Sequence, residues 1–292
     1  MNGIIIIDKP ANWTSHDVVA KLRGVLKQKR VGHGGTLDPM ATGVLPVFIG
    51  RATRASEFCE NSEKEYIAGF LPGTVTDTQD ITGNVLEKND VTINQYDLET
   101  VLPLFTGKQT QIPPMYSAVK IGGKKMYELA RKGIEIERKP REIYISKLKT
   151  HPTDKPGIFA LRIVCSKGTY IRTLCHDIGA KLGCGGTLFS LHRIRAGGYT
   201  DNMAVSLDDV IAASLSASVN DILLKTDSIF SEYPSLTIDV NETRKAKNGA
   251  VCTAQGNNQN GKYKIYSTSG EFLLFGEVTE NKIKTIKSFF EV

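Results

Sequence analysis

Residues 32–39 read Gly32-His33-Gly34-Gly35-Thr36-Leu37-Asp38-Pro39, so that three glycines and a proline surround one acidic residue. Glycine and proline at this density predict a loop with a rigidly fixed shape. A carboxylate held by such a loop can act as a nucleophile or as a base at one defined point in space. Asp38 is therefore the first candidate for a catalytic residue. The alternative is an Asx-type turn residue before a proline, without any chemical role.

The segments around this loop predict a mixture of strands and helices. Ile4 to Asp8 form a short apolar run typical of a buried strand, and Thr14-Ser15-His16-Asp17 has the pattern of a helix start with a capping pair. A later helix from Thr169 to Leu182 is expected to be capped by Thr169 and ended by Gly183. Because no strand–helix–strand repeat is evident, the fold class is α+β. Further strands are predicted at 44–49, 66–71, 143–148, 159–166 and 188–194, and further helices at 52–59, 95–105 and 125–131.

A boundary is predicted near Tyr233-Pro234, because the pattern changes there. Beyond it a short helix near 242–247 precedes strands near 263–267, 272–278 and 283–288, which Gly/Asn turns separate. A β unit of this size depends on a larger body for stability. We therefore predict a main domain over 1–232 and a small β domain over 233–292.

Charge is unevenly distributed along the chain. The net charge is +6, but residues 107–149 hold eleven Lys/Arg and four Glu, an excess of 11 − 4 = +7. Residues 201–240 hold seven acidic residues and one lysine, which gives 1 − 7 = −6. The basic stretch is a candidate nucleic-acid surface, and the acidic stretch should face away from it. The alternative is that both runs are ordinary solvated faces.

The composition is that of a globular protein, with 40% hydrophobic and 23% charged residues. The apolar start, Ile4 to Ile7, is too short for a signal peptide or a membrane span, so we expect a cytoplasmic protein without a membrane partner. Five cysteines without a C-x-x-C pair fit a reducing compartment. Cys175-His176 with Cys184 lacks the ligand spacing of known zinc sites.

Arg172 is the second candidate site residue. It lies in the first turn of the predicted helix and is flanked by apolar residues, which suggests burial. A buried arginine needs a carboxylate partner. Paired with Asp38, it would hold the carboxylate ionised and oriented, whereas taken alone it could equally form a structural salt bridge.

Five stretches in order resemble the TruB-type tRNA pseudouridine-55 synthases of bacteria. That likeness covers roughly residues 1 to 200 and implies the pseudouridine synthase fold, with a mixed, largely antiparallel central sheet flanked by helices and loops. It also implies a basic thumb insertion at about 107–149 and a PUA-like C-terminal β domain that binds RNA. The stretches are Ile7-Asp8-Lys9-Pro10 with Thr14-Ser15-His16-Asp17; Gly32 to Pro39; Lys64-Glu65-Tyr66; Gln111 to Lys120, with Pro113-Pro114-Met115-Tyr116; and Cys165 to Leu174.

The resemblance also implies roles for single residues. Asp38 would act on the target uridine, by covalent attack or by removing a sugar proton, and Arg172 would be its ion-pair partner. Tyr66 would stack on the uracil and help to remove the base proton, and Leu191 would line the pocket. His33 would fill the stack that the flipped uridine leaves. Without the family, Tyr66 reads as an ordinary strand aromatic and His33 as an incidental loop residue.

The expected partner is tRNA, bound through its T arm and loop by a monomeric protein. The expected phosphate contacts are Lys9, Lys64, Lys120, Lys124 and Lys125. The implied isomerisation is redox-neutral and consumes no water, so no metal or cofactor is expected. Two other functions use the same features: a folding helper that refolds tRNA without chemistry, and a hydrolase that excises a flipped base. Pseudouridine formation by an Asp38→Ala protein would rule out the enzymatic role assigned to Asp38, and release of free uracil would favour the hydrolase.

Overall fold

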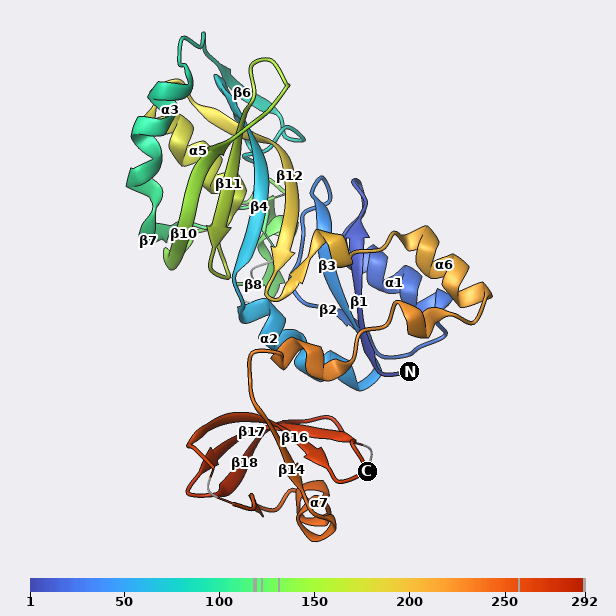
Figure 1. The fold of residues 1–292 in the computed structure, drawn as a ribbon. Helices are drawn as coiled ribbons and strands as arrows, with labels where there is room; N and C mark the ends of the chain where they lie inside the picture. Colours follow the sequence, from blue (N-terminus) through green and yellow to red (C-terminus); the bar gives the residue numbers. More distant parts are fainter. Residues whose placement is uncertain (118–119, 122, 131, 257, 291–292) are drawn as a thin grey trace.

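The computed structural model describes the chain except residues 118–119, 122, 131, 257 and 291–292, and at 120–121 and 124–125 it describes the backbone alone. Two bodies follow each other along the chain (Figure 1). The larger body is built on a sheet that begins at Gly3, and the smaller body on a second sheet that begins at Ser235.

Nine strands of the described chain form the main sheet, whose central order is β1-β3-β12-β4-β11-β10-β7. Neighbouring strands are antiparallel except β12 and β3, which run parallel where His192 and Arg193 face Thr42 and Gly43. The prediction of a mixed, largely antiparallel sheet is therefore confirmed. The strands are β1 Gly3–Lys9, β2 Val31–His33, β3 Thr42–Ile49, β4 Lys64–Pro72, β7 Gly107–Gln111, β10 Arg141–His151, β11 Phe159–Cys165, β12 Gly186–Ala196 and β13 Tyr199–Thr200.

Helices cover the sheet and close the core. In the largest buried cluster, Leu174 and Ile178 of the helix beginning at Ile171 pack with Phe70, Ile163 and Leu188 of the sheet. The helices are α1 Ser15–Val25, α2 Ser56–Asn61, α3 Gln95–Val101, α4 Met126–Ala130, α5 Ile171–Lys181 and α6 Leu207–Leu215. Short 3-10 segments are η1 Gly50–Ala55, η2 Leu102–Phe105, η3 Asp201–Met203, η4 Val219–Asp221 and η5 Thr226–Phe230, and two hairpins join β5 Thr74–Thr76 to β6 Val85–Lys88 and β8 Lys120–Ile121 to β9 Lys124–Lys125.

Of the two predicted N-terminal helix caps, the one of α1 is confirmed and the one of α5 is wrong. The capping box of α1 is confirmed, because the Asp17 N–H donates to Thr14 Oγ1 at 3.0 Å and the Thr14 N–H donates to Asp17 Oδ2 at 2.9 Å. The Thr169 cap is wrong: Tyr170 is the N-cap of α5 and makes no side-chain cap bond. The Thr169 hydroxyl instead donates to the Ser166 carbonyl at 2.9 Å, which fixes the preceding turn. Gly183 ends the helix as predicted, in the left-handed region with φ +76°.

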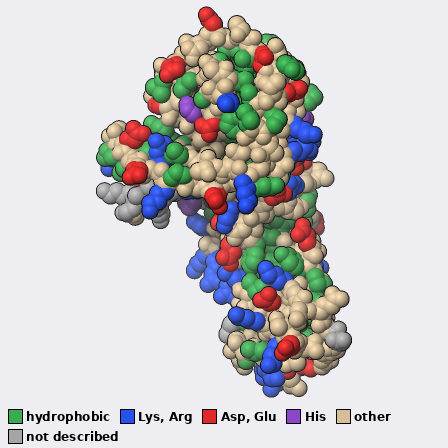
Figure 2. Space-filling model, turned by 90° about the vertical axis from the view of Figure 1, so that its left-hand side faces the viewer, with side chains coloured by type: hydrophobic (Ala, Val, Ile, Leu, Met, Phe, Trp, Pro, Cys, Tyr) green, Lys and Arg blue, Asp and Glu red, His purple; other side chains and the backbone are tan. Residues whose placement is uncertain are grey.

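The basic stretch has its two ends inside the sheet. Strands β7 and β10 pair with each other, with Arg141 opposite Gln111, so they are sheet strands rather than parts of an insertion. The part that leaves the sheet is 112–140, with β8, β9 and α4. It projects from the larger body (Figure 2). The thumb insertion at about 107–149 stays a prediction, and 112–140 is the part of it that lies outside the main sheet.

The second sheet has the order β14-β16-β17-β18-β15 and its own core, which includes Ile265, Leu274 and Ile283. Stacked aromatic rings join it to the larger body: Phe230 lies 4.2 Å from Phe275 between ring centroids. No helix in the described part of the chain is long and apolar enough to span a membrane. The elements are β14 Ser235–Ile238, α7 Val240–Lys247, β15 Cys252–Thr253, β16 Gly261–Ser267, β17 Phe272–Thr279 and β18 Lys282–Ser288.

Candidate active site

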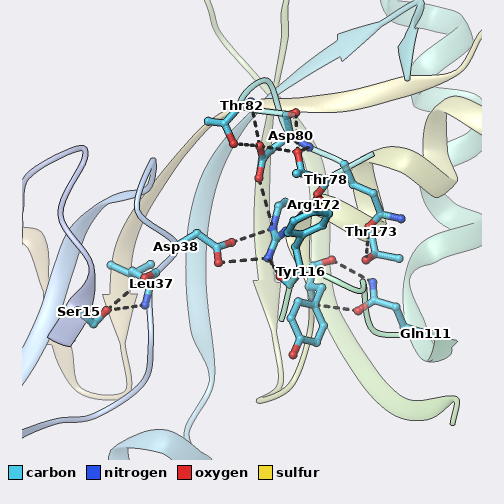
Figure 3. Close-up of polar contacts among 12 residues, drawn as sticks. Ser15, Leu37, Asp38, Thr78, Asp80, Thr82, Gln111, Tyr116, Arg172 and Thr173 are labelled. Atoms are coloured by element: carbon cyan, nitrogen blue, oxygen red, sulfur yellow. Dashed lines mark hydrogen bonds and ion pairs between the residues drawn. The ribbon is translucent and has the colours of Figure 1, made fainter. Parts of the chain in front are cut away.

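Asp38 and Arg172 form the predicted ion pair. Arg172 Nε lies 2.9 Å from Asp38 Oδ2, and Arg172 Nη2 donates to Asp38 Oδ1 at 3.2 Å (Figure 3). This two-point contact fixes the plane of the carboxylate as well as its position. The arginine side chain is 5% exposed and the aspartate side chain 35% exposed. The guanidinium is therefore buried, and the carboxylate is accessible to an incoming ligand.

Hydrogen bonds between the Ser15 side chain and the backbone of Leu37 hold the loop that carries Asp38. The Leu37 N–H donates to Ser15 Oγ at 2.9 Å, and the Ser15 hydroxyl donates back to the Leu37 carbonyl at 3.2 Å. Gly35 adopts a φ of +112°, which favours glycine at that position. Because Val31–His33 form strand β2, the predicted loop begins only at Gly34. Ser15 of α1 and the buried Leu37 together hold Asp38 at one point in space.

Gln111 positions the first turn of α5, where Arg172 lies. Its side-chain oxygen accepts the Tyr170 N–H at 2.8 Å, and its side-chain nitrogen donates to the Tyr170 carbonyl at 3.0 Å. A residue 59 positions away in the sequence therefore does the work that a local N-cap would do. This contact links the end of β7, before the candidate thumb, to the ion pair.

The Arg172 guanidinium has further partners that the sequence did not reveal. Its Nη1 donates to the Thr78 carbonyl at 3.1 Å, and its Nη2 donates to the Tyr116 carbonyl at 2.9 Å. Its Nε also lies 3.7 Å from Oδ2 of Asp80, whose side chain is 7% exposed. The buried cation thus lies between two carboxylates and two carbonyls (Figure 3).

Asp80 is the functional candidate that sequence reasoning missed. Its Oδ1 accepts hydrogen bonds from the Thr82 N–H at 2.9 Å and from the Thr78 hydroxyl at 2.9 Å. These bonds orient Oδ2 toward Arg172. The local pattern, an aspartate two residues from a threonine on each side, is common in ordinary turns, so only the long-range contact to Arg172 distinguishes it.

Tyr66 and Leu191 lie in the same buried cluster as Leu37, the neighbour of Asp38. Tyr66 is 8% exposed and Leu191 is 7% exposed, so both side chains form an apolar surface beside the loop. Burial raises the pKa of the Tyr66 phenol to about 12. The Asp38 carboxylate acts on the Tyr66 phenol, and Leu191 shares the buried cluster with Tyr66 and Leu37.

His33 belongs to strand β2 and is half-buried. Its Nδ1 is buried and makes no hydrogen bond within the described residues. Burial lowers the pKa of the imidazole, and the cation of Arg193 lowers it further. Both effects favour the neutral form of the ring.

Two of the predicted RNA contacts lie inside the protein, which corrects the expectation that they bind phosphate. Lys9 is 0% exposed, and its Nζ donates to the carbonyls of Trp13 at 2.6 Å and Pro39 at 3.2 Å. Lys64 is 5% exposed, and its Nζ donates to three carbonyls, Glu60 at 2.6 Å among them. Both ammonium groups therefore donate to backbone carbonyls. Their side chains are too deeply buried to reach a phosphate.

The other predicted contacts, the side chains of Lys120, Lys124 and Lys125, lie outside the described residues. Their backbone forms the hairpin of β8 and β9 in the projecting segment. Within the described chain, no group of three or more His, Cys, Asp or Glu side chains is placed to hold a metal ion. The five cysteines are free and buried.

Family models match most of the chain. The model of the TruB family pseudouridylate synthase N-terminal domain matches residues 23–171, and the model of the tRNA pseudouridylate synthase B C-terminal domain matches residues 172–231. The chain belongs to the TruB family. Two TruB-family relatives are the proteins named tRNA pseudouridine synthase B from Clostridium acetobutylicum, 38% identical over 98% of this chain and 99% of that protein, and from Syntrophomonas wolfei, 42% identical over 98% of this chain and 96% of that protein.

Solved structures agree with the TruB-family assignment at the level of the fold. A chain of a Cbf5–Nop10–Gar1 complex matches with a TM-score of 0.76 at 24% identity, covering 99% of this chain and 85% of that one. A chain of an archaeal box H/ACA Nop10–Cbf5 complex matches with a TM-score of 0.71 at 23% identity, covering 99% and 86%. The main sheet of this TruB-family chain is therefore the pseudouridine synthase fold, and its C-terminal sheet is consistent with a PUA-like domain. The chain is an isomerase of the pseudouridine synthase class.

Proposed function

We propose that this TruB-family enzyme isomerises uridine 55 in the T loop of tRNA to pseudouridine, with Asp38 as its catalytic residue. The relatives named tRNA pseudouridine synthase B support tRNA as the substrate. The observation that carries the proposal is the half-exposed carboxylate of Asp38, clamped at two points by a buried guanidinium. A clamped, open carboxylate beside an apolar surface suits a flipped pyrimidine nucleotide.

The reaction needs no second substrate. The bond between N1 of uracil and C1′ of the ribose breaks, the base turns, and a bond between C5 and C1′ forms. C5 loses a proton and N1 gains one, so atoms and charge balance within the nucleotide. Asp38 acts on the sugar or the base of this nucleotide, either by covalent attack on a carbon or by taking a sugar proton, and Arg172 keeps its two oxygens in place.

Apolar side chains would receive the base. Uracil must leave its stack before the carboxylate can reach the glycosidic bond, and this costs a few kcal/mol. Tyr66 and Leu191 offer a ring and an aliphatic surface that offset this cost by stacking and burial. His33 would occupy the vacated stack, because its neutral ring has an area similar to that of a base. The projecting segment 112–140 would close over the T arm and neutralise phosphates.

The test is a tritium-release assay with an unmodified tRNA transcript that carries uridine labelled at C5. The Asp38→Asn variant should release no tritium above background and should bind the transcript as tightly as the unchanged protein. Asp208→Asn, an exposed acid in the first turn of α6, is the matched control and should retain full activity. Turnover by Asp38→Asn would overturn the aspartate mechanism, free uracil in the product would favour base excision, and label release from a position other than 55 would overturn the site assignment.

A further inference from the structure

Arg193 is among the largest fully buried side chains of the described chain, with 1% of its surface exposed. It lies on β12, where that strand pairs with two neighbours at once. Its Cα partner on β3 is Gly43, and its Cα partner on β4 is Tyr66. An arginine on β12 therefore lies between the strand after the Asp38 loop, β3, and the strand that carries Tyr66, β4.

The guanidinium of Arg193 binds backbone rather than carboxylates. Its Nε donates to the Val44 carbonyl at 2.7 Å, and its Nη2 donates to the Gly35 carbonyl at 3.1 Å. No Asp or Glu side chain of the described residues pairs with it, in contrast to Arg195 two positions later, which lies 3.1 Å from Glu65. A buried cation without a carboxylate costs several kcal/mol, so such a group calls for a compensating role.

Close backbone packing fixes where Arg193 can lie. A Cβ on Gly43 would come within 2.3 Å of the Arg193 carbonyl oxygen, and Gly43 has a φ of +96°. A Cβ on Gly35 would lie 3.6 Å from Arg193 Nη1. Glycine at position 43 lets β3 approach the backbone of Arg193, and the φ of +112° at Gly35 favours glycine in the loop whose carbonyl binds the guanidinium.

Tyr66 lies directly opposite Arg193 on the neighbouring strand β4, and its phenol is one of the ionisable groups on which the Arg193 cation acts. Burial raises the pKa of this phenol, and the Arg193 cation opposes that rise by charge and by hydrogen bonding. The remaining ionisable groups that act on the phenol are Cys165 and Asp38, and both raise its pKa. Arg193 is thus the cation that favours negative charge on the Tyr66 oxygen.

We propose that Arg193 is a positioning residue of the isomerisation, which braces the Asp38 loop through the Gly35 carbonyl and presents its guanidinium to the Tyr66 hydroxyl. The inference deepens the proposed function and rests on it, because it gives meaning to the placement of Asp38 and Tyr66. Arg172 aligns the carboxylate from one side, and Arg193 aligns the loop backbone and the phenol from the other. A proton taken from the base by the phenol oxygen would then leave that oxygen next to a fixed positive charge.

The experiment replaces Tyr66 with 3-fluorotyrosine, whose more acidic phenol titrates where the protein stays folded, and follows the ¹⁹F resonance against pH without RNA. Arg193→Met removes the charge and should raise the pKa of the residue-66 phenol by about 1, the effect expected for the loss of a neighbouring opposite charge. Arg193→Lys keeps the charge and should shift that pKa by less. Arg195→Met is the matched control on the same strand and should leave the resonance titration unchanged.

A kinetic measurement tests the bracing. Under single-turnover conditions with tRNA, Arg193→Lys should lower the rate constant at least about tenfold while the tRNA Kd stays within about twofold, because Arg193 contacts no RNA surface. If Arg193→Met does not fold, the rate of Arg193→Lys decides alone, and an unchanged rate in that variant then overturns the inference. An unchanged phenol pKa in Met and an unchanged rate in Lys would overturn the inference. The titration needs no turnover, so it stands or falls separately from the Asp38→Asn result that tests the proposed function.

Discussion

A single buried guanidinium shared by Asp38 and Asp80 organises the site at the scale of the residue. Arg172 holds Asp38 at two points and lies 3.7 Å from Asp80, which two threonines orient. Each partner restricts the rotamers of the arginine, and the arginine in turn restricts the carboxylate that meets the substrate. We therefore expect Asp80 to act on the reaction through Arg172 rather than by contact with the substrate.

Asp80→Asn should lower the single-turnover rate at least about tenfold, because the neutral amide no longer holds the guanidinium in register. The tRNA Kd should stay within about twofold, since Asp80 is buried. Asp77→Asn is the matched control: Asp77 lies in the same loop, but it binds Asn84 instead of Arg172. Equal losses of the single-turnover rate in the two variants would show that both substitutions act by disturbing the structure of the loop, not through Arg172.

The titration of Lys64 makes the free energy of unfolding depend on pH, and the sign of this dependence follows from its pKa. Burial lowers the pKa of its ammonium from 10.5 to about 8, so between these values the unfolded chain binds more protons than the folded protein. The free energy of unfolding should therefore rise with pH across this window, by at most about 1.4 kcal/mol per pH unit from this group. Lys64→Met lacks the titrating group, so denaturant curves between pH 8 and 10 should show a smaller slope than the unchanged protein. Parallel slopes in the two proteins would contradict the assignment.

At the scale of the element, short-range patterns predicted most strands and helices, and long-range contacts explain the exceptions. The α1 capping box was readable because Thr14 and Asp17 are three residues apart. The start of α5 could not be predicted from neighbouring residues, because its first turn is held by Gln111, 59 residues away. In the same way, the expected burial of Arg172 predicted its pairing with Asp38. No local sequence pattern marks Asp80 as a second partner of Arg172. Lys9 and Lys64 are predicted to contact RNA, whereas in the structure their ammonium groups donate to backbone carbonyls.

Thr14→Ala removes the side-chain acceptor at the start of α1 and should lower the free energy of unfolding by about 1 kcal/mol. Thr14→Ser keeps the hydroxyl and should cost less than half as much. Urea denaturation followed by circular dichroism measures both. A loss below about 0.3 kcal/mol in the Ala variant would mean that packing, rather than the cap, fixes this helix.

At the scale of the whole molecule, positive charge gathers where RNA would lie. Figure 2 shows Lys and Arg side chains concentrated at the waist between the two bodies and near the projecting segment. A groove of about 470 Å³ at this junction is lined by residues that include Arg54 and Lys287. Arg54 donates to the Ser288 carbonyl at 3.0 Å, so the same basic side chain also ties the C-terminal sheet to η1.

The joint variant Lys124→Gln/Lys125→Gln should weaken tRNA binding and flatten its dependence on salt. Each phosphate contact removed should lower the slope of log K against log salt by about 0.9 for duplex RNA treated like B-form DNA. Lys225→Gln, in the acidic stretch, is the control and should leave the slope unchanged. A slope unaffected by the double substitution would remove this hairpin from the RNA surface. Filter binding at several salt concentrations gives the slopes.

The clamp between Asp38 and Arg172 joins residues 134 positions apart, and β12 must arrive before the Asp38 loop has its Arg193 brace. During translation the first half of the protein therefore leaves the ribosome as a scaffold without a working centre. Fragments that stop before β12 should be silent toward tRNA, even though the loop with its aspartate is already present. We expect a nascent chain to remain without activity at least until the strand Gly186–Ala196 has been synthesised.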